Sequence, residues 1–159
     1  VYANRLFDPE KTFNGQKGIA YGGPDLSQRN LKILTSVRKL QLSNEFPELP
    51  PLSASGDINS GRLALEYILR GASSCQMHTV FQLPSSEYPM RKGTKTERAL
   101  HRIFFSPDDG LIAGLQYCKE RWAGLFPGEP LSLIQVSNLH QNREFFKAVC
   151  GTRAQFEGE

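Results

Sequence analysis

Residues 50–82 constrain the fold of this chain more than any other stretch. They read PPLSASGDINSGRLALEYILRGASSCQMHTVFQ, in which two short apolar segments flank an amphipathic stretch of helical periodicity. The pattern predicts a strand over 50–55, a helix over 60–70 that ends at Gly71, and a strand over 73–79. Two strands joined through a helix form a βαβ unit, whose strands run parallel.

The predicted helix has two distinct faces. Leu65, Ile68 and Leu69 recur on one helical face, and we expect them to pack inward. We expect Arg62 and Arg70 to point outward into solvent. Such a helix covers one face of a sheet.

The turn after the first predicted strand has the composition of an anion-binding loop. Gly56 and Gly61 permit tight turns that leave backbone N–H groups uncovered before a helix start, and Ser60 is a favoured N-cap. In parallel α/β folds, ligands bind at the carboxyl ends of the strands, and barrel loops after the last two strands often hold phosphate. Both loops of the unit are therefore candidate phosphate sites, although the glycine spacing also fits plain turns.

The residue identities in this unit follow a family pattern. The matching residues are Pro51, Gly56, Ile58, Ser60, Gly61, Gly71, Ala72, Ser73, Gln76 and Thr79. The pattern is Pro-Ile-Ile-Gly-Val-Gly-Gly-Ile-x-Ser-Gly, a helix, and Gly-Ala-Ser-x-Val-Gln-x-Tyr-Thr, so the unit resembles the carboxyl-terminal part of the dihydroorotate dehydrogenase family. The departures are Ala54 for the first glycine, Asp57 for the third, Cys75 for valine and His78 for tyrosine.

Residues 1–27 resemble the preceding unit of the same family, in which a strand ends in Thr-Asn-Thr and a loop carries Gly-Gly-Leu-Ser-Gly-x-Pro-Leu. Asn4 matches the asparagine that contacts the pyrimidine substrate, with Ala3 and Arg5 in place of the flanking threonines. Gly22 and Pro24 match the loop if one residue is inserted. The resemblance thus covers roughly residues 1–83.

The resemblance implies an FMN-dependent enzyme that oxidises dihydroorotate to orotate in pyrimidine biosynthesis. The residues that would contact FMN, mainly through their backbone N–H groups, are Gly22, Gly56, Asp57, His78 and Thr79. Those that would contact a dihydroorotate-like pyrimidine are Asn4 and Arg5. The His78 side chain could act as an acid or base. We favour a structural role for it, because the family's tyrosine acts mainly through its backbone N–H. A carboxylate at Asp57 is repulsive to phosphate unless it points away.

Length limits how much of a barrel the chain can form. A (β/α)8 barrel takes about 250 residues, whereas the chain has 159. We expect an α/β fold that is the carboxyl-terminal portion of such a TIM barrel, with about the last three βα units over 1–83. Residues 84–159 are expected to form a helical extension packed on the same domain. The family's base and flavin-contacting lysine lie on earlier strands, so we expect no catalytic residue here and an inactive isolated chain.

Two other functions remain open on the same residues. One is a phosphate-binding barrel of different activity, either a flavin oxidoreductase acting on another ring or a non-flavin enzyme of sugar or nucleotide phosphates. The other is an inactive half-barrel or subunit that buries its open sheet edge against a second copy or a missing amino-terminal half.

The remaining elements follow from local patterns. We expect a strand over 2–6, a long functional loop over 8–27, and a helix over 28–42 capped by Asp25 or Ser27. The apolar residues of that helix should pack on the sheet; they are Leu31, Leu34, Val37 and Leu40.

The carboxyl-terminal half is expected to be mainly helical. Ser106, Pro107 and Asp109 predict the start of a helix over 107–125. Its inward residues should be Leu111, Leu115, Cys118 and Trp122. Residues 131–136 fit a strand or a helix, and a helix is expected around Phe145, Phe146 and Val149.

Composition excludes several functional classes. The chain is 39% hydrophobic and 22% charged with a net charge of +3, which suits a soluble globular domain and gives too little charge for a dedicated nucleic-acid surface. We therefore interpret the basic residues from Arg91 to Lys95, with Arg98 and Arg102, as a solvated face. No signal or membrane-spanning segment occurs, so we expect a cytoplasmic protein, with membrane association through a missing amino terminus left open.

The cysteines and histidines do not form a metal-binding pattern. Cys75, Cys118 and Cys150 are too few and too far apart for a zinc or disulfide framework, so we expect reduced thiols. His101 and His140 have no ligand-type partner at i+4. We predict no metal site.

Overall fold

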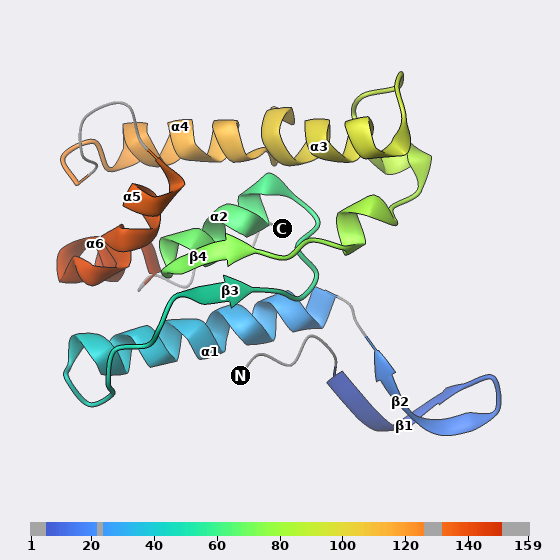
Figure 1. Cartoon of the computed structure of the whole chain (residues 1–159), viewed down its shortest axis with the longest axis horizontal. Coiled ribbons are helices and arrows are strands. Elements are labelled where there is room, and N and C mark those ends of the chain that lie inside the picture. The colour runs from blue at the N-terminus through green and yellow to red at the C-terminus, as the bar shows by residue number, and fades with distance from the viewer. Residues whose placement is uncertain (1–5, 22–23, 126–131, 151–159) are drawn as a thin grey trace.

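The computed structural model describes residues 6–21, 24–125 and 132–150, which form a mixed α/β structure (Figure 1). Its elements are β1 (Leu6–Phe13), β2 (Gln16–Tyr21), α1 (Pro24–Leu42), β3 (Leu52–Ala54), α2 (Gly61–Leu69), β4 (Ala72–Cys75), η1 (Thr79–Phe81), η2 (Ser85–Glu87), α3 (Lys95–Phe105), α4 (Leu111–Arg121), α5 (Leu133–Asn138), η3 (Leu139–Gln141) and α6 (Arg143–Cys150).

The predicted βαβ unit is confirmed. Strands β3 and β4 pair in parallel, and α2 connects them. The Ser60 hydroxyl accepts the Leu63 N–H at 3.2 Å, which makes it the N-cap of α2. After α2, Gly71 has a φ of +87° and donates its N–H to the Ile68 carbonyl at 2.8 Å. The second strand is shorter than predicted, because β4 ends at Cys75.

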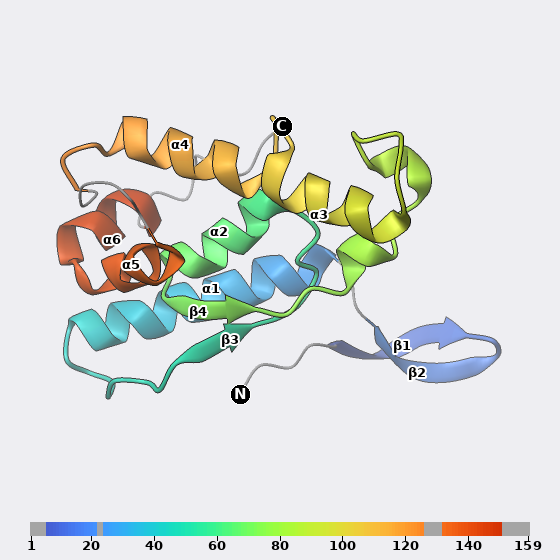
Figure 2. The same ribbon diagram turned by 45° about the horizontal axis from the view of Figure 1, so that its top comes forward.

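The long loop predicted over residues 8–27 is wrong. Strands β1 and β2 form an antiparallel hairpin, which projects away from the helices in both views (Figures 1 and 2). Its turn consists of Asn14 and Gly15, with φ values of +49° and +78°, as a two-residue turn of this kind requires. Of the strand predicted over 2–6, only Leu6 lies among the described residues, and it opens β1.

Helix α1 begins earlier than predicted, at Pro24, a residue well suited to a first helical turn. Asp25 and Ser27 lie inside the helix, so the predicted cap is wrong. The predicted apolar stripe is also partly wrong, because Leu40 is 40% exposed. The buried face instead follows an i, i+4 spacing through Leu26, Asn30, Leu34 and Arg38.

Helices α3 and α4 follow one another along the same side of the molecule (Figure 1). The predicted helix start at Ser106 is wrong, because Ser106 ends α3 and Gly110 is the N-cap of α4. The Gly110 N–H donates to the Ser106 carbonyl at 2.9 Å, which closes a turn between the two helices. A Thr94–Glu97 capping box starts α3.

The structure also tests the predictions for the apolar run over 131–136 and for the last helix. Residues 133–138 are helical, which resolves the ambiguity of the apolar run in favour of a helix with a Ser132–Gln135 capping box. The helix predicted around Phe145 is α6. Leu111 and Cys118 of α4 are buried as predicted.

The core forms around α2, which lies between the parallel strands and the α3–α4 pair (Figures 1 and 2). One cluster joins α2 to α4, α5 and α6 through Leu65, Leu69, Cys118, Val136 and Phe145. A second joins α2 to α1 and the strands, and a third lies beneath α3. The outward position predicted for Arg70 is wrong, since its side chain is only 13% exposed and pairs with Glu66.

The strands of the described residues form two separate two-stranded sheets. One edge of β3 and one edge of β4 therefore pair with no other strand in the described part of the chain. Across that part, no helix combines the length and apolar character needed to cross a membrane.

Candidate phosphate site at the strand ends

The loops after β3 and β4 meet at the carboxyl edge of the parallel pair. Gly56 and Asp57 follow β3, whereas His78 and Thr79 follow β4. The Thr79 side chain forms a hydrogen bond with the Asp57 carboxylate, which links the two loops directly. The structure thus brings together four of the residues to which the sequence assigns cofactor contacts.

The loop after β3 has a backbone that favours glycine at two consecutive positions. Gly56 has a φ of +108° and Asp57 a φ of +49°, both left-handed. A Cβ on Gly56 would lie 2.8 Å from the Asn30 side-chain nitrogen. Asn30 is buried on α1 and donates to the Ser55 carbonyl at 3.0 Å, so α1 fixes the position of this loop.

The backbone donors of the two loops are uncommitted. Among the hydrogen bonds of the described residues, none uses the N–H of Gly56, Asp57, His78 or Thr79. None of these four residues is buried. Uncommitted backbone N–H groups at the carboxyl ends of parallel strands can bind an anion. We call these four residues the cradle.

The start of α2, by contrast, does not face a ligand, which corrects the expectation from the sequence. The Arg62 N–H donates to the Asp109 carbonyl at 2.7 Å, and the Leu63 N–H is taken by Ser60. Gly61 packs directly against the junction of α3 and α4. Any anion at this edge would be held by the loops rather than by the helix end.

Asp57 gives the cradle an acidic side chain. Its Oδ2 accepts from the Asn59 side-chain nitrogen at 3.4 Å, in addition to the bond from Thr79. Burial raises the pKa of Asp57 above its ordinary value, and the Thr79 hydrogen bond opposes this rise. The uncommitted N–H groups would favour an anion such as a phosphate, whereas the Asp57 carboxylate would repel a fully charged one.

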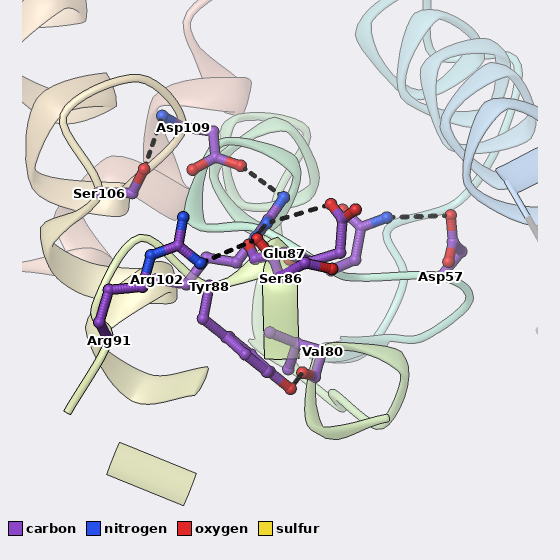
Figure 3. Close-up of polar contacts among 10 residues, drawn as sticks. Asp57, Val80, Ser86, Glu87, Tyr88, Arg91, Arg102, Ser106 and Asp109 are labelled. Atoms are coloured by element: carbon purple, nitrogen blue, oxygen red, sulfur yellow. Dashed lines mark hydrogen bonds and ion pairs between the residues drawn. The ribbon is translucent and has the colours of Figure 1, made fainter. Parts of the chain in front are cut away.

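An arginine that the sequence placed on a solvated face supports the loop (Figure 3). Arg102 of α3 is only 18% exposed, and its Nε donates to the Asn59 carbonyl at 3.3 Å. Its other nitrogens pair with the Asp109 carboxylate at 3.0 Å and with the Glu87 carbonyl. Nothing in the local sequence links Arg102 to Asn59, which lies 43 positions earlier, so only the fold identifies this contact.

The remaining predicted site residues have different outcomes. Asn4, Arg5 and Gly22 lie outside the described residues. The His78 side chain is exposed, and its Nε2 lies 3.3 Å from the Gln82 side-chain nitrogen. It therefore makes no contact with a described acid or base that would identify a catalytic role.

The grooves of the surface lie elsewhere. The larger, of about 720 Å³, is lined by the end of α1, the loop that follows it and η3. Because that loop enters β3, this groove lies at the opposite end of the strands from the cradle. A second, of about 340 Å³, lies between α2 and α4. We give the cradle more weight, because the sequence assigns cofactor contacts to its residues and to none that line either groove.

His140, in the larger groove, predicts a dependence of stability on pH. Burial lowers its pKa below the ordinary 6.5, opposed by the hydrogen bond to the Ser137 carbonyl, and nearby Arg38 lowers it further. The unfolded chain then binds a proton more readily than the folded chain, so stability is full above about pH 6.5 and falls as the pH drops. We expect urea denaturation to give a smaller free energy of unfolding at pH 5 than at pH 7.5.

A variant separates this effect from general acid sensitivity. His140→Gln should lose less stability between pH 7.5 and pH 5 than the wild type does, because glutamine does not titrate. Equal losses in both proteins would contradict the assignment to His140.

The cysteines are buried or half-buried thiols rather than reactive groups: Cys118 and Cys150 are buried and Cys75 is half-buried. All three are free, and burial raises the pKa of Cys75 to about 11 and that of Cys118 to about 12. In the described ranges, no group of three or more His, Cys, Asp or Glu side chains could hold a metal ion.

Comparisons with protein-family models, curated proteins and solved structures find no match to the chain. A function must therefore be inferred from the cradle and from the sequence pattern around it.

Proposed function

We propose that this chain supplies the cofactor-phosphate end of an FMN-dependent oxidoreductase resembling dihydroorotate dehydrogenase. The observation that carries the proposal is the cradle, whose four uncommitted backbone N–H groups lie at the ends of two parallel strands. These are the positions at which the resemblance places the FMN phosphate. The left-handed backbone of Asp57 supports it further, because the family has glycine there.

In this proposal β3 and β4 are the last strands of a (β/α)8 barrel. Parallel sheets are almost always larger than two strands and covered on both faces. The unpaired edges of β3 and β4 are therefore suited to further strands, from a longer polypeptide or from a second copy. Residues 50–83 would belong to the barrel wall, and the helices of 84–159 would cover it. The antiparallel hairpin of β1 and β2 does not fit the parallel wall that the sequence predicted for residues 1–27 and would lie outside it.

Gly56, Asp57, His78 and Thr79 would hold the FMN phosphate through their backbone N–H groups. Gly22 would add a further contact to the cofactor, and Asn4 and Arg5 would contact a dihydroorotate-like pyrimidine. Bound FMN supplies the redox chemistry, as an acceptor of hydride from the substrate. The proton acceptor would come from outside this chain, so the chain alone would be inactive. We propose a cytoplasmic location for the enzyme.

Binding of FMN and of riboflavin distinguishes a phosphate cradle from other sites, because the two flavins differ only by the phosphate. We expect a fluorescence titration of the chain to give clearly tighter binding of FMN. His78→Ala should bind FMN as the wild type does, since the contact is made by the backbone. Equal affinity for the two flavins would rule out a phosphate cradle. A longer parent protein should copurify with flavin and oxidise dihydroorotate.

The unpaired strand edges also favour a second candidate, an inactive half-barrel subunit that needs a partner. Size-exclusion chromatography with light scattering tests it. A subunit of this kind should form a dimer or aggregate when isolated, whereas a stable monomer would argue against any need for pairing.

A further inference from the structure

The Asp57 side chain contacts both loops of the cradle. Its carboxylate belongs to the loop after β3 and accepts the Thr79 hydroxyl from the loop after β4. Asn59 donates to the same carboxylate at 3.4 Å, and Arg102 in turn holds the Asn59 carbonyl (Figure 3). Two neighbours, Asn59 on the same loop and Thr79 on the other, thus hold the carboxylate at the cradle.

We infer that Asp57 restricts the cradle to anions that carry a proton, so that it accepts a monoprotonated phosphate group and rejects a dianion such as sulfate. This inference rests on the proposed function, because it concerns the same phosphate site. One proton lies between a carboxylate oxygen of Asp57 and an oxygen of the ligand, and no covalent bond to phosphorus forms or breaks.

The physical reason is that two anions in contact repel each other unless a proton lies between them. A carboxylate and a dianion repel each other strongly when they are close and partly removed from water. With one proton between them, the same two groups form a short charge-assisted hydrogen bond. Phosphate groups take up a proton near neutral pH, whereas sulfate does not. Burial of Asp57, which raises its pKa, favours the shared proton further.

The charged groups around Asp57 do not cancel its charge. Arg102 of α3 is paired with the Asp109 carboxylate at 3.0 Å and reaches Asp57 only through Asn59. His78, on the loop after β4, has its Nε2 against the Gln82 side chain. In the described part of the chain, Asp57 takes part in no ion pair. Its charge therefore acts on whatever binds in the cradle.

Calorimetric titrations of the full chain with methyl phosphate, a phosphate monoester like the phosphate of FMN, and with sulfate test the inference. We expect the wild type to bind methyl phosphate at least about tenfold more tightly at pH 6 than at pH 8, because a monoester loses its last proton near pH 6. We expect no measurable binding of sulfate at either pH. Titrations in two buffers of different ionisation enthalpy should show uptake of a proton at pH 8.

Two variants remove the carboxylate in different ways. Asp57→Gly restores the residue that suits a φ of +49°, and Asp57→Asn keeps the shape of the side chain without its charge. Both should bind sulfate and methyl phosphate alike, and their affinity for methyl phosphate should no longer fall from pH 6 to pH 8. Asp108→Asn is the matched control, since it removes an exposed carboxylate outside the cradle, in the turn before α4, and should keep the wild-type selectivity.

The outcomes separate this inference from the proposed function. If the wild type binds sulfate as well as methyl phosphate, or if both Asp57 variants still reject sulfate, Asp57 does not set the selectivity, although preference for FMN over riboflavin would stand. If neither the wild type nor either variant binds methyl phosphate, the cradle is not an anion site, and both proposals fail.

Discussion

Alanine in place of Gly61 is expected to lower the free energy of unfolding by about 3 kcal/mol or more, a large fraction of the stability of a domain of this size. A Cβ at this position would lie far inside van der Waals contact with the carbonyl oxygen of Ile103 and the backbone nitrogen of Leu111. Both are backbone atoms at the junction of α3 and α4, so they cannot rotate away as a flexible side chain can. The first turn of α2 would have to move.

That movement would also break the Arg62 N–H bond to the Asp109 carbonyl, which is 2.7 Å long. Urea denaturation followed by circular dichroism measures the loss. Gly124→Ala is the matched control, because a Cβ there meets nothing within 4 Å, and its stability should stay close to that of the wild type. Similar losses in the two variants would show that α2 does not approach the α3–α4 junction this closely.

The βαβ unit could be predicted because its signals are local. Ser60 before the helix, Gly71 after it and the apolar segments on either side each point to the same structure, and no distant contact has to be known. The two loops then meet at one edge because parallel strands place their carboxyl ends together. The meeting of Asp57 and Thr79 follows from that topology.

The hairpin could have been predicted but was not. Asn14-Gly15 between two stretches of strand-forming residues is a strong signal for a two-residue hairpin turn. Because this region resembles a barrel unit, it was predicted to form a strand followed by a functional loop. Local turn chemistry was the better guide here, because the left-handed backbone at Asn14 and Gly15 is set by those two residues themselves.

The support of the cradle could not be predicted from sequence. Arg102 contacts Asn59 only because α3 packs against the start of α2, and no spacing along the chain encodes that packing. The covered start of α2 could not be predicted for the same reason. A glycine at position 61 is compatible both with an open turn and with a close contact between helices, and only the structure shows the close contact. In both cases the information lies in tertiary packing.

Methionine in place of Arg70 is expected to cost about 3–5 kcal/mol, because it leaves a buried carboxylate without its partner. Glu66 and Arg70 pair within α2, and their side chains are 8% and 13% exposed. Arg70 also donates to the Thr35 hydroxyl at 2.8 Å and to the Glu66 carbonyl at 2.9 Å, which ties α2 to α1. The second oxygen of Glu66 is buried and has no hydrogen-bond partner, so Arg70 is the main compensation for this charge.

A double variant decides whether the loss comes from the unpaired charge or from lost packing. Adding Glu66→Met to Arg70→Met should restore much of the stability, because the pair is then replaced by apolar side chains of similar length. The exposed pair of Lys17 and Glu10, whose side chains are 66% and 78% exposed, gives the control, and Lys17→Met should change the urea midpoint little. If the double variant is no more stable than Arg70→Met, the tie between α2 and α1 matters more than the charge of Glu66.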